Sequence, residues 1–197
     1  RRMDRSDPVI QRIRSAIFPG IPEEYYSVNG DMYALPLDAC VQMLFCRKDI
    51  FEDELIKRGY YEANRKRLAI PESFQEYNQV AEFFTRRYNR KSPTAYGTTL
   101  TCGRSYPAAC EVLPRFYELG GRGPDEEGRV QVVTAEMRAA FESCLESEKY
   151  ATKEPHFWWQ ESAEVFSDGF TAMNILFSNY ASDMIHNVSS KVAGKII

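Results

Sequence analysis

Polar side chains that could hold a ligand stand at three points of the chain, each directly after a run of strand-like sequence. These side chains are Asp38, Arg104, Ser105, Tyr106, Ser178 and Asn179. In open α/β sheets, ligands bind in the crevice beyond the carboxyl ends of the strands. We therefore expect these side chains to take part in binding a small molecule.

Two adjacent tryptophans, Trp158 and Trp159, form a fourth candidate cluster in a proline-containing loop. Aromatic faces stack on the C–H faces of a sugar or polyol, while nearby polar groups bind its hydroxyls. The four clusters together predict a site for a neutral carbohydrate-like ligand. The plainer alternative is that both tryptophans only close the core.

Signatures of catalysis and of cofactor binding are missing from the sequence. It has two histidines and no HExxH, P-loop or GxGxxG pattern, and residues 103–107 begin like a nucleophile elbow but lack its second glycine. The five cysteines form no CxxC pair and no metal-like spacing with histidine, so we expect no metal and no cofactor. Whether Cys102 and Cys110 form a disulfide is undecided, because spacing alone cannot establish a bridge. An enzyme using Asp38 and Glu111 as a glycosidase carboxylate pair is the main alternative.

The composition is that of an ordinary globular protein, and the net charge gives no reason to expect a nucleic-acid or anionic-membrane partner. The net charge of the 197 residues is −3, and the basic run at 86–91 is typical of a solvated helix end. No stretch of about 18 apolar residues occurs, so no span of a bilayer is predicted. The first and last segments both suggest that the chain is a piece of a longer protein.

The elements that must position these residues alternate between strands and helices of 8–15 residues. We expect helices over 8–17, 53–58, from a capping box at Ser73, from Pro107, from Thr134 and over 161–167, with a short one at 178–183. The strands expected are 25–28 and 32–35 around Asn29-Gly30, then 43–46, 96–101, 171–177 and 191–197. In the helix after Thr134, the side chains expected on the buried face are Met137, Phe141, Cys144 and Leu145.

The stretch LPLDACVQMLFC, residues 35–46, has the look of a buried strand interrupted by Asp38. An ionised carboxylate is costly in an apolar interior unless it is paired. Asp38 therefore needs either a partner or contact with water, and the stretch alone does not say which.

Several segments resemble, in the right order, the family 1 extracellular solute-binding proteins, the carbohydrate-binding subunits of bacterial ABC importers. Residues 28–38 and 42–51 resemble the family's G-x-x-Y-x-x-P … K-D-L-F segment, and residues 70–77 its P-x-T-W-x-E helix start. Tyr96-Gly97 and residues 119–121 also match segments of the family in the same order, and residues 161–173 resemble its F-x-x-G-x-x-A-M segment. The similarity runs from about residue 26 to residue 197.

The resemblance implies a type II periplasmic-binding-protein fold, in which a mixed, mostly parallel sheet is flanked by helices. Residues 1–37 would form a strip of the first lobe leading into the hinge, and residues 38–197 the second lobe. Residues 35–46 would then be two short strands that meet at the lobe crossing, with the Asp38 carboxylate facing water. Asp38 would stand beside the hinge, Ser178 and Asn179 at the turn after the A-M strand, and Arg104, Ser105 and Tyr106 at a turn that often carries an aromatic contact. Trp158 and Trp159 would lie in a ligand loop, with Trp159 facing the cleft. In the maltose-binding branch a tryptophan stands where this chain has Asn179.

The function implied by the resemblance is binding rather than bond-making. Two hinged lobes would close on a sugar or oligosaccharide and deliver it to the permease subunits of an ABC transporter, outside the cytoplasm. The membrane would be reached only through an anchor or the permease. A carbohydrate-active enzyme and a sensory module that reuses the fold remain the alternatives.

Overall fold

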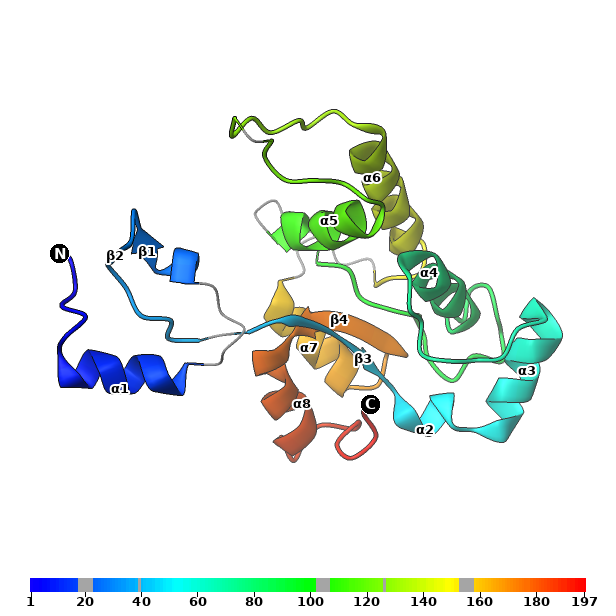
Figure 1. Cartoon of the computed structure of the whole chain (residues 1–197). Helices are drawn as coiled ribbons and strands as arrows, with labels where there is room; N and C mark the ends of the chain where they lie inside the picture. The colour runs from blue at the N-terminus through cyan, green and yellow to red at the C-terminus, as the bar shows by residue number, and fades with distance from the viewer. Residues whose placement is uncertain (18–22, 39, 102–106, 126, 153–157) are drawn as a thin grey trace. The chain divides into compact units, whose positions relative to one another are not determined.

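The computed structural model describes residues 1–17, 23–38, 40–101, 107–125, 127–152 and 158–197. They divide into two compact units, Arg1–Val41 and Gln42–Ile197, and each is described by itself (Figure 1). This division falls close to the expected boundary between residues 37 and 38. Whether the two units are parts of two lobes stays a prediction.

The first unit contains one helix and one hairpin. Helix α1 (Pro8–Ala16) is capped by Asp7, whose carboxylate accepts from the Val9 amide at 2.8 Å. Strands β1 (Ser27–Val28) and β2 (Asp31–Met32) pair antiparallel after the turn η1 (Glu23–Tyr25). Asn29 and Gly30 connect them with φ of 51° and 81°. Positive φ at both turn positions is the geometry that an Asn-Gly pair favours in tight hairpins, so the predicted hairpin is confirmed with shorter strands.

Residues 35–41 are not strand in the described structure, and regular pairing begins only at Gln42. Leu37 is fully exposed and Val41 is exposed by 63 %. The two short strands expected to meet at Asp38 do not reach it, because β2 ends at Met32 and β3 begins at Gln42. Asp38 itself is exposed, so its charge carries no burial cost.

The second unit is built on strands β3 (Gln42–Cys46) and β4 (Met173–Phe177), which pair antiparallel with Cys46 opposite Met173. Parallel bridges join Tyr96 to Thr171 and Thr98 to Ala151, and an antiparallel bridge joins Arg47 to Ile196. The α/β class is confirmed, with mixed pairing. The regular ladder among the described residues is antiparallel, whereas a mostly parallel sheet was expected. The strands expected at 96–101 and 191–197 are reduced to these bridges.

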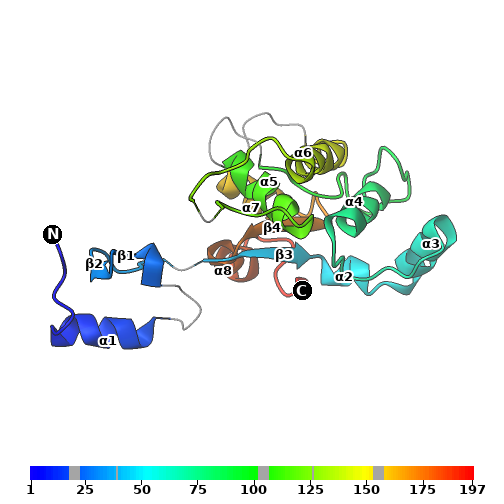
Figure 2. The same cartoon turned by 45° about the horizontal axis from the view of Figure 1, so that its top comes forward.

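Alternate side chains of this sheet enter two separate cores. Leu44, Cys46, Met173 and Ile175 pack with the cluster that includes Phe84 of the α4 region. Phe45 and Leu176 pack on the opposite face, with Phe166 and Met184. The sheet thus lies between helix α4 (Phe74–Phe83) and the helices α7 (Trp159–Ser167) and α8 (Ala181–His186) (Figure 1). Figure 2 gives a second view of the same elements.

Local sequence signals explain where the helices of this unit begin. Helices α2 (Lys48–Phe51) and α3 (Glu54–Asn64) follow β3, and Asp53 caps α3 by accepting from Leu55 and Ile56 amides. Ser73 caps α4, and its hydroxyl accepts from the Glu76 amide at 3.2 Å, as the capping-box pattern predicts. The Glu76 carboxylate reaches the Glu72 amide, one residue before the expected one.

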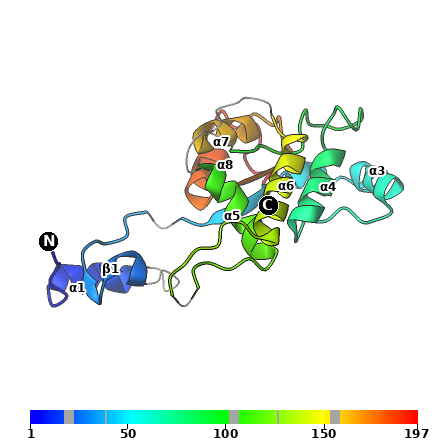
Figure 3. The ribbon, with the colours of Figure 1, turned by 90° about the horizontal axis from the view of Figure 1, so that it is seen from above.

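Helices α5 (Pro107–Glu118) and α6 (Ala135–Glu148) pack together, and α6 lies beside α4 (Figure 3). The buried side of α6 consists of Ala140, Cys144 and Ser147. Phe141 and Leu145 are instead exposed by 53 % and 62 %, so their predicted place in the core is wrong. Small side chains on α6 let α5 and α6 approach closely. Phe141 and Leu145 each follow a buried residue and therefore point about 100° away from it around the helix axis.

Candidate functional site

Three aromatic rings meet where α7 begins and β4 ends, and we refer to Trp158, Trp159 and Phe177 as the aromatic corner. The Trp158 and Trp159 rings are 6.3 Å apart at 80°, and Trp159 stands edge-on to Phe177 at 4.9 Å and 84°. The Trp158 amide donates to Glu161 at 3.1 Å, which fixes the first turn of α7. Trp158 remains exposed by 41 %, so part of an indole faces solvent beside this packed group.

A polar turn adjoins the aromatic corner, because Ser178 directly follows Phe177. Residues Ser178–Tyr180 form the 3-10 turn η2, in which Asn179 is exposed while Ser178 and Tyr180 are half-buried. Tyr180 and Trp159 pack against the same apolar cluster. Two of the four predicted clusters, the tryptophans and Ser178-Asn179, therefore lie together, and offer an aromatic edge beside hydrogen-bonding groups.

The other predicted site residues lie either in the first unit or outside the described residues. Asp38 belongs to the unit Arg1–Val41, where it is exposed. Arg104, Ser105 and Tyr106 lie outside the described residues, so their predicted roles stay predictions. Cys110 is a free cysteine, which speaks against the Cys102–Cys110 disulfide that the sequence had left undecided. Sequence reasoning also missed Phe177, although an aromatic residue next to Ser178-Asn179 was a signal that could have identified it.

Glu111, the second carboxylate of the glycosidase alternative, is occupied by structural contacts. Its side chain accepts from the Thr101 amide at 3.0 Å and the Thr101 hydroxyl at 2.7 Å, and pairs with Arg115 at 3.1 Å. Only 5 % of Glu111 is exposed. A general acid or base must reach its substrate within hydrogen-bond distance. Both oxygens of Glu111 face protein donors instead, so its role in this structure is to hold α5.

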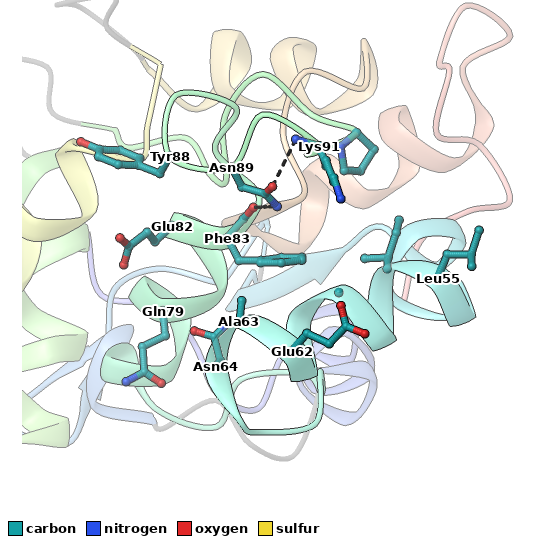
Figure 4. A pocket seen from close by; sticks show the side chains of 13 residues that line it. Leu55, Glu62, Ala63, Asn64, Gln79, Glu82, Phe83, Tyr88, Asn89 and Lys91 are labelled. Atoms are coloured by element: carbon teal, nitrogen blue, oxygen red, sulfur yellow. Dashed lines mark hydrogen bonds between the residues drawn. The ribbon is translucent and has the colours of Figure 1, made fainter.

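A hollow of about 540 Å³ lies elsewhere on the second unit, between α3 and α4 (Figure 4). Phe83 and Leu55 contribute its apolar wall, and Glu62 and Lys91 lie at its sides. In this hollow the Asn89 side-chain nitrogen donates to the Phe83 backbone carbonyl at 3.0 Å, and its side-chain oxygen accepts from the Lys91 backbone amide at 3.1 Å. None of the predicted site residues that the structure describes lines it. We place the candidate site at the aromatic corner, where predicted residues from two elements converge.

Neither metal binding nor a membrane span is indicated in the part of the chain that the structure describes. No group of three or more His, Cys, Asp or Glu side chains is arranged to hold a metal ion among those residues. Within the same residues, no helix combines the length and apolar character needed to cross a bilayer.

Comparison with known proteins gives matches through structure alone. No protein-family model and no curated protein sequence matches the chain. A solute-binding protein of Agrobacterium radiobacter K84 in complex with ribitol superposes with a TM-score of 0.76 and 21% identity over 100% of this chain. Maltose-bound MalE3 of T. maritima superposes with a TM-score of 0.77 and 18% identity, also over 100% of this chain.

The chain has the fold of sugar ABC-transporter solute-binding proteins. A further structure of this kind, from Agrobacterium vitis S4 with bound D-mannitol, has a TM-score of 0.68 and 20% identity over 89% of this chain. The predicted resemblance is thereby confirmed at the level of the fold. The chain spans 47%, 46% and 39% of these three solute-binding proteins, which is less than half of each.

Proposed function

We propose that this chain is part of an extracytoplasmic solute-binding protein, which binds a sugar or oligosaccharide and delivers it to the permease of an ABC transporter. The observation that carries the proposal is the aromatic corner beside the Ser178-Asn179 turn, in a fold shared with proteins that bind ribitol, maltose and D-mannitol. The neighbours are binding proteins rather than enzymes.

Sugar binding fits the chemistry of this corner. The exposed part of Trp158 offers an apolar face for the C–H groups of a pyranose or a polyol. The exposed amide of Asn179, close along the chain to Phe177, offers both a donor and an acceptor to hydroxyl groups. Neutral ligands of this kind need no charged partner, which agrees with the absence of an ionic cluster at the described part of the corner.

In this proposal Asp38, Arg104, Ser105 and Tyr106 complete the site when two lobes close on the sugar. Residues 1–37 would belong to the first lobe and residues 38–197 to the second, with the hinge near Asp38. Contacts that the ligand makes only in the closed form would shift the equilibrium between the open and closed forms. The closed form would then be the one that the permease subunits recognise.

Thermal-shift screening of the full-length gene product tests this function. The panel contains maltose, ribitol and D-mannitol, with amino acids as the contrasting ligand class. A specific sugar at about a hundredfold excess over Kd should stabilise the folded protein by about 2.7 kcal/mol and raise its Tm. A Tm that rises with amino acids and with no sugar or polyol would contradict the proposal.

A further inference from the structure

Three buried polar side chains join α7 and β4, the two elements that carry the aromatic corner. Asn174 lies in the middle of β4 and Ser162 in α7, and neither is exposed to solvent. Thr99, exposed by only 4 %, follows Gly97, whose carbonyl accepts from the Met173 amide at the start of β4 at 3.0 Å. We refer to these three residues as the polar triplet. An amide inside the apolar run MNILF is a feature that packing alone does not explain.

The polar triplet is a closed hydrogen-bonded network. The Asn174 side-chain amide donates to the Ser162 carbonyl at 3.1 Å, and its oxygen lies 2.8 Å from the Thr99 hydroxyl and 3.1 Å from the Ser162 hydroxyl. The two hydroxyls are 2.6 Å apart. An unsatisfied buried polar group costs about 1–3 kcal/mol, so such a network is tolerated in a core only when its members satisfy one another.

The position of the triplet links it to the candidate site. Ser162 is four residues after Trp158 in α7, and Asn174 is three residues before Phe177 in β4. Other contacts between the two elements are apolar: Trp159 stands edge-on to Phe177, and Ala163 and Leu176 belong to one apolar cluster. Apolar contact is non-directional and permits small axial shifts, whereas hydrogen bonds select one register. A shift of one helical residue would move the indoles by about 1.5 Å.

We infer that Asn174 is a positioning residue of the sugar site, and that Ser162 and Thr99 act with it. The triplet sets the register of α7 on β4, and thereby fixes where Trp158 and Trp159 stand relative to the turn Ser178–Tyr180. This inference rests on the proposed sugar-binding function for its consequence on affinity, but not for its consequence on the placement of the indoles.

The test compares Asn174→Leu with Ser147→Ala in the full-length protein labelled with 5-fluorotryptophan. Trp158 and Trp159 are the two tryptophans of this chain, and their ¹⁹F signals can be assigned with Phe substitutions. Ser147 is the matched control, because it is equally buried and bonds Asn78 at 2.6 Å in a different network. The probes for affinity are maltose, ribitol and D-mannitol.

Asn174→Leu should shift both ¹⁹F signals of the ligand-free protein and weaken sugar binding about tenfold. Ser147→Ala should lower Tm while leaving the signals and Kd as in the wild type. Unchanged ¹⁹F signals in folded Asn174→Leu, with Kd within about twofold, would overturn the inference. If the wild type binds none of the probes, the proposed function fails, and the ¹⁹F signals alone decide the inference. If Asn174→Leu does not fold, Ser162→Ala and Thr99→Val take its place. Shifted ¹⁹F signals with weaker binding would again support the inference, and unchanged signals and Kd would overturn it.

Discussion

Replacing Arg115 by methionine should destabilise the second unit strongly. Arg115 is exposed by only 1 %, and its guanidinium pairs with Glu111 at 3.1 Å and donates to the Ser147 hydroxyl at 3.0 Å. Its guanidinium carbon also lies 4.1 Å from the centre of the Phe74 ring. Methionine keeps much of the packing against Phe74, so the main loss is the positive charge beside a buried carboxylate.

The expected cost follows from the burial of both partners. Removing one partner of a buried ion pair costs about 3–5 kcal/mol, because the other charge is left uncompensated. That is a large share of a typical unfolding free energy of about 5–15 kcal/mol. Urea unfolding followed by far-UV circular dichroism measures the loss directly. Adding Glu111→Gln to Arg115→Met should recover part of it, because the uncompensated charge is then removed.

Arg58→Met provides the matched control for this measurement. Arg58 pairs with Glu62 at 2.9 Å, but the two side chains are exposed by 77% and 61%. An exposed pair one helical turn apart contributes about 0.3–0.5 kcal/mol, so this variant should unfold almost as the wild type does. The reasoning is refuted if Arg115→Met lowers the free energy of unfolding no more than Arg58→Met does. It is also refuted if the double variant Glu111→Gln/Arg115→Met loses no less stability than Arg115→Met alone.

Two more outcomes follow from the same core. Burial raises the pKa of Cys46 to about 12 from an ordinary value of 9.0, so the unfolded chain loses this proton first and stability falls above about pH 9. Cys46→Ala should flatten that decline by about 1.4 kcal/mol per pH unit in urea titrations at alkaline pH, and an unchanged slope would count against a buried thiol. Gly97→Ala should unfold the protein or lower Tm sharply, because the new Cβ would lie 2.0 Å from the Ala81 carbonyl oxygen. A Tm equal to that of the wild type would show that this close approach is absent.

Local signals in the sequence predicted the beginnings of elements well. Ser73 and Thr134 cap the helices that were expected to follow them, and Asn29-Gly30 forms the expected turn. These features depend on hydrogen bonds within a few residues, so the neighbouring sequence is enough to determine them.

Tertiary packing decided the features that were predicted wrongly. The spacing of Phe141 and Leu145 is helical, yet α5 packs against Ala140 and Cys144 of α6 instead. Hydrophobic periodicity finds an apolar stripe, but it cannot tell that a close helix pair prefers the small residues next to it. The same limit explains the residues at 96–98 and 196, which are β-prone but make only single bridges.

The candidate site was predictable as residue types but not as a geometry. Trp158 and Trp159 were identified as a possible aromatic platform, and Ser178-Asn179 as a polar turn, without any sign that they adjoin. Their proximity comes from α7 packing on β4, and is visible in the contact of Trp159 with Phe177. Asn174 escaped notice because a single amide in an apolar strand carries no local signal of its buried partners.

Isothermal titration calorimetry of the full-length protein, as wild type and as Trp158→Ala, tests the central claim most directly. The account predicts saturable binding of at least one sugar or polyol to the wild type. It also predicts about tenfold weaker binding to the folded Trp158→Ala variant, because loss of the partly exposed indole removes stacking area. Absence of heat with every sugar, or equal affinities for the two proteins, would contradict sugar binding at the aromatic corner.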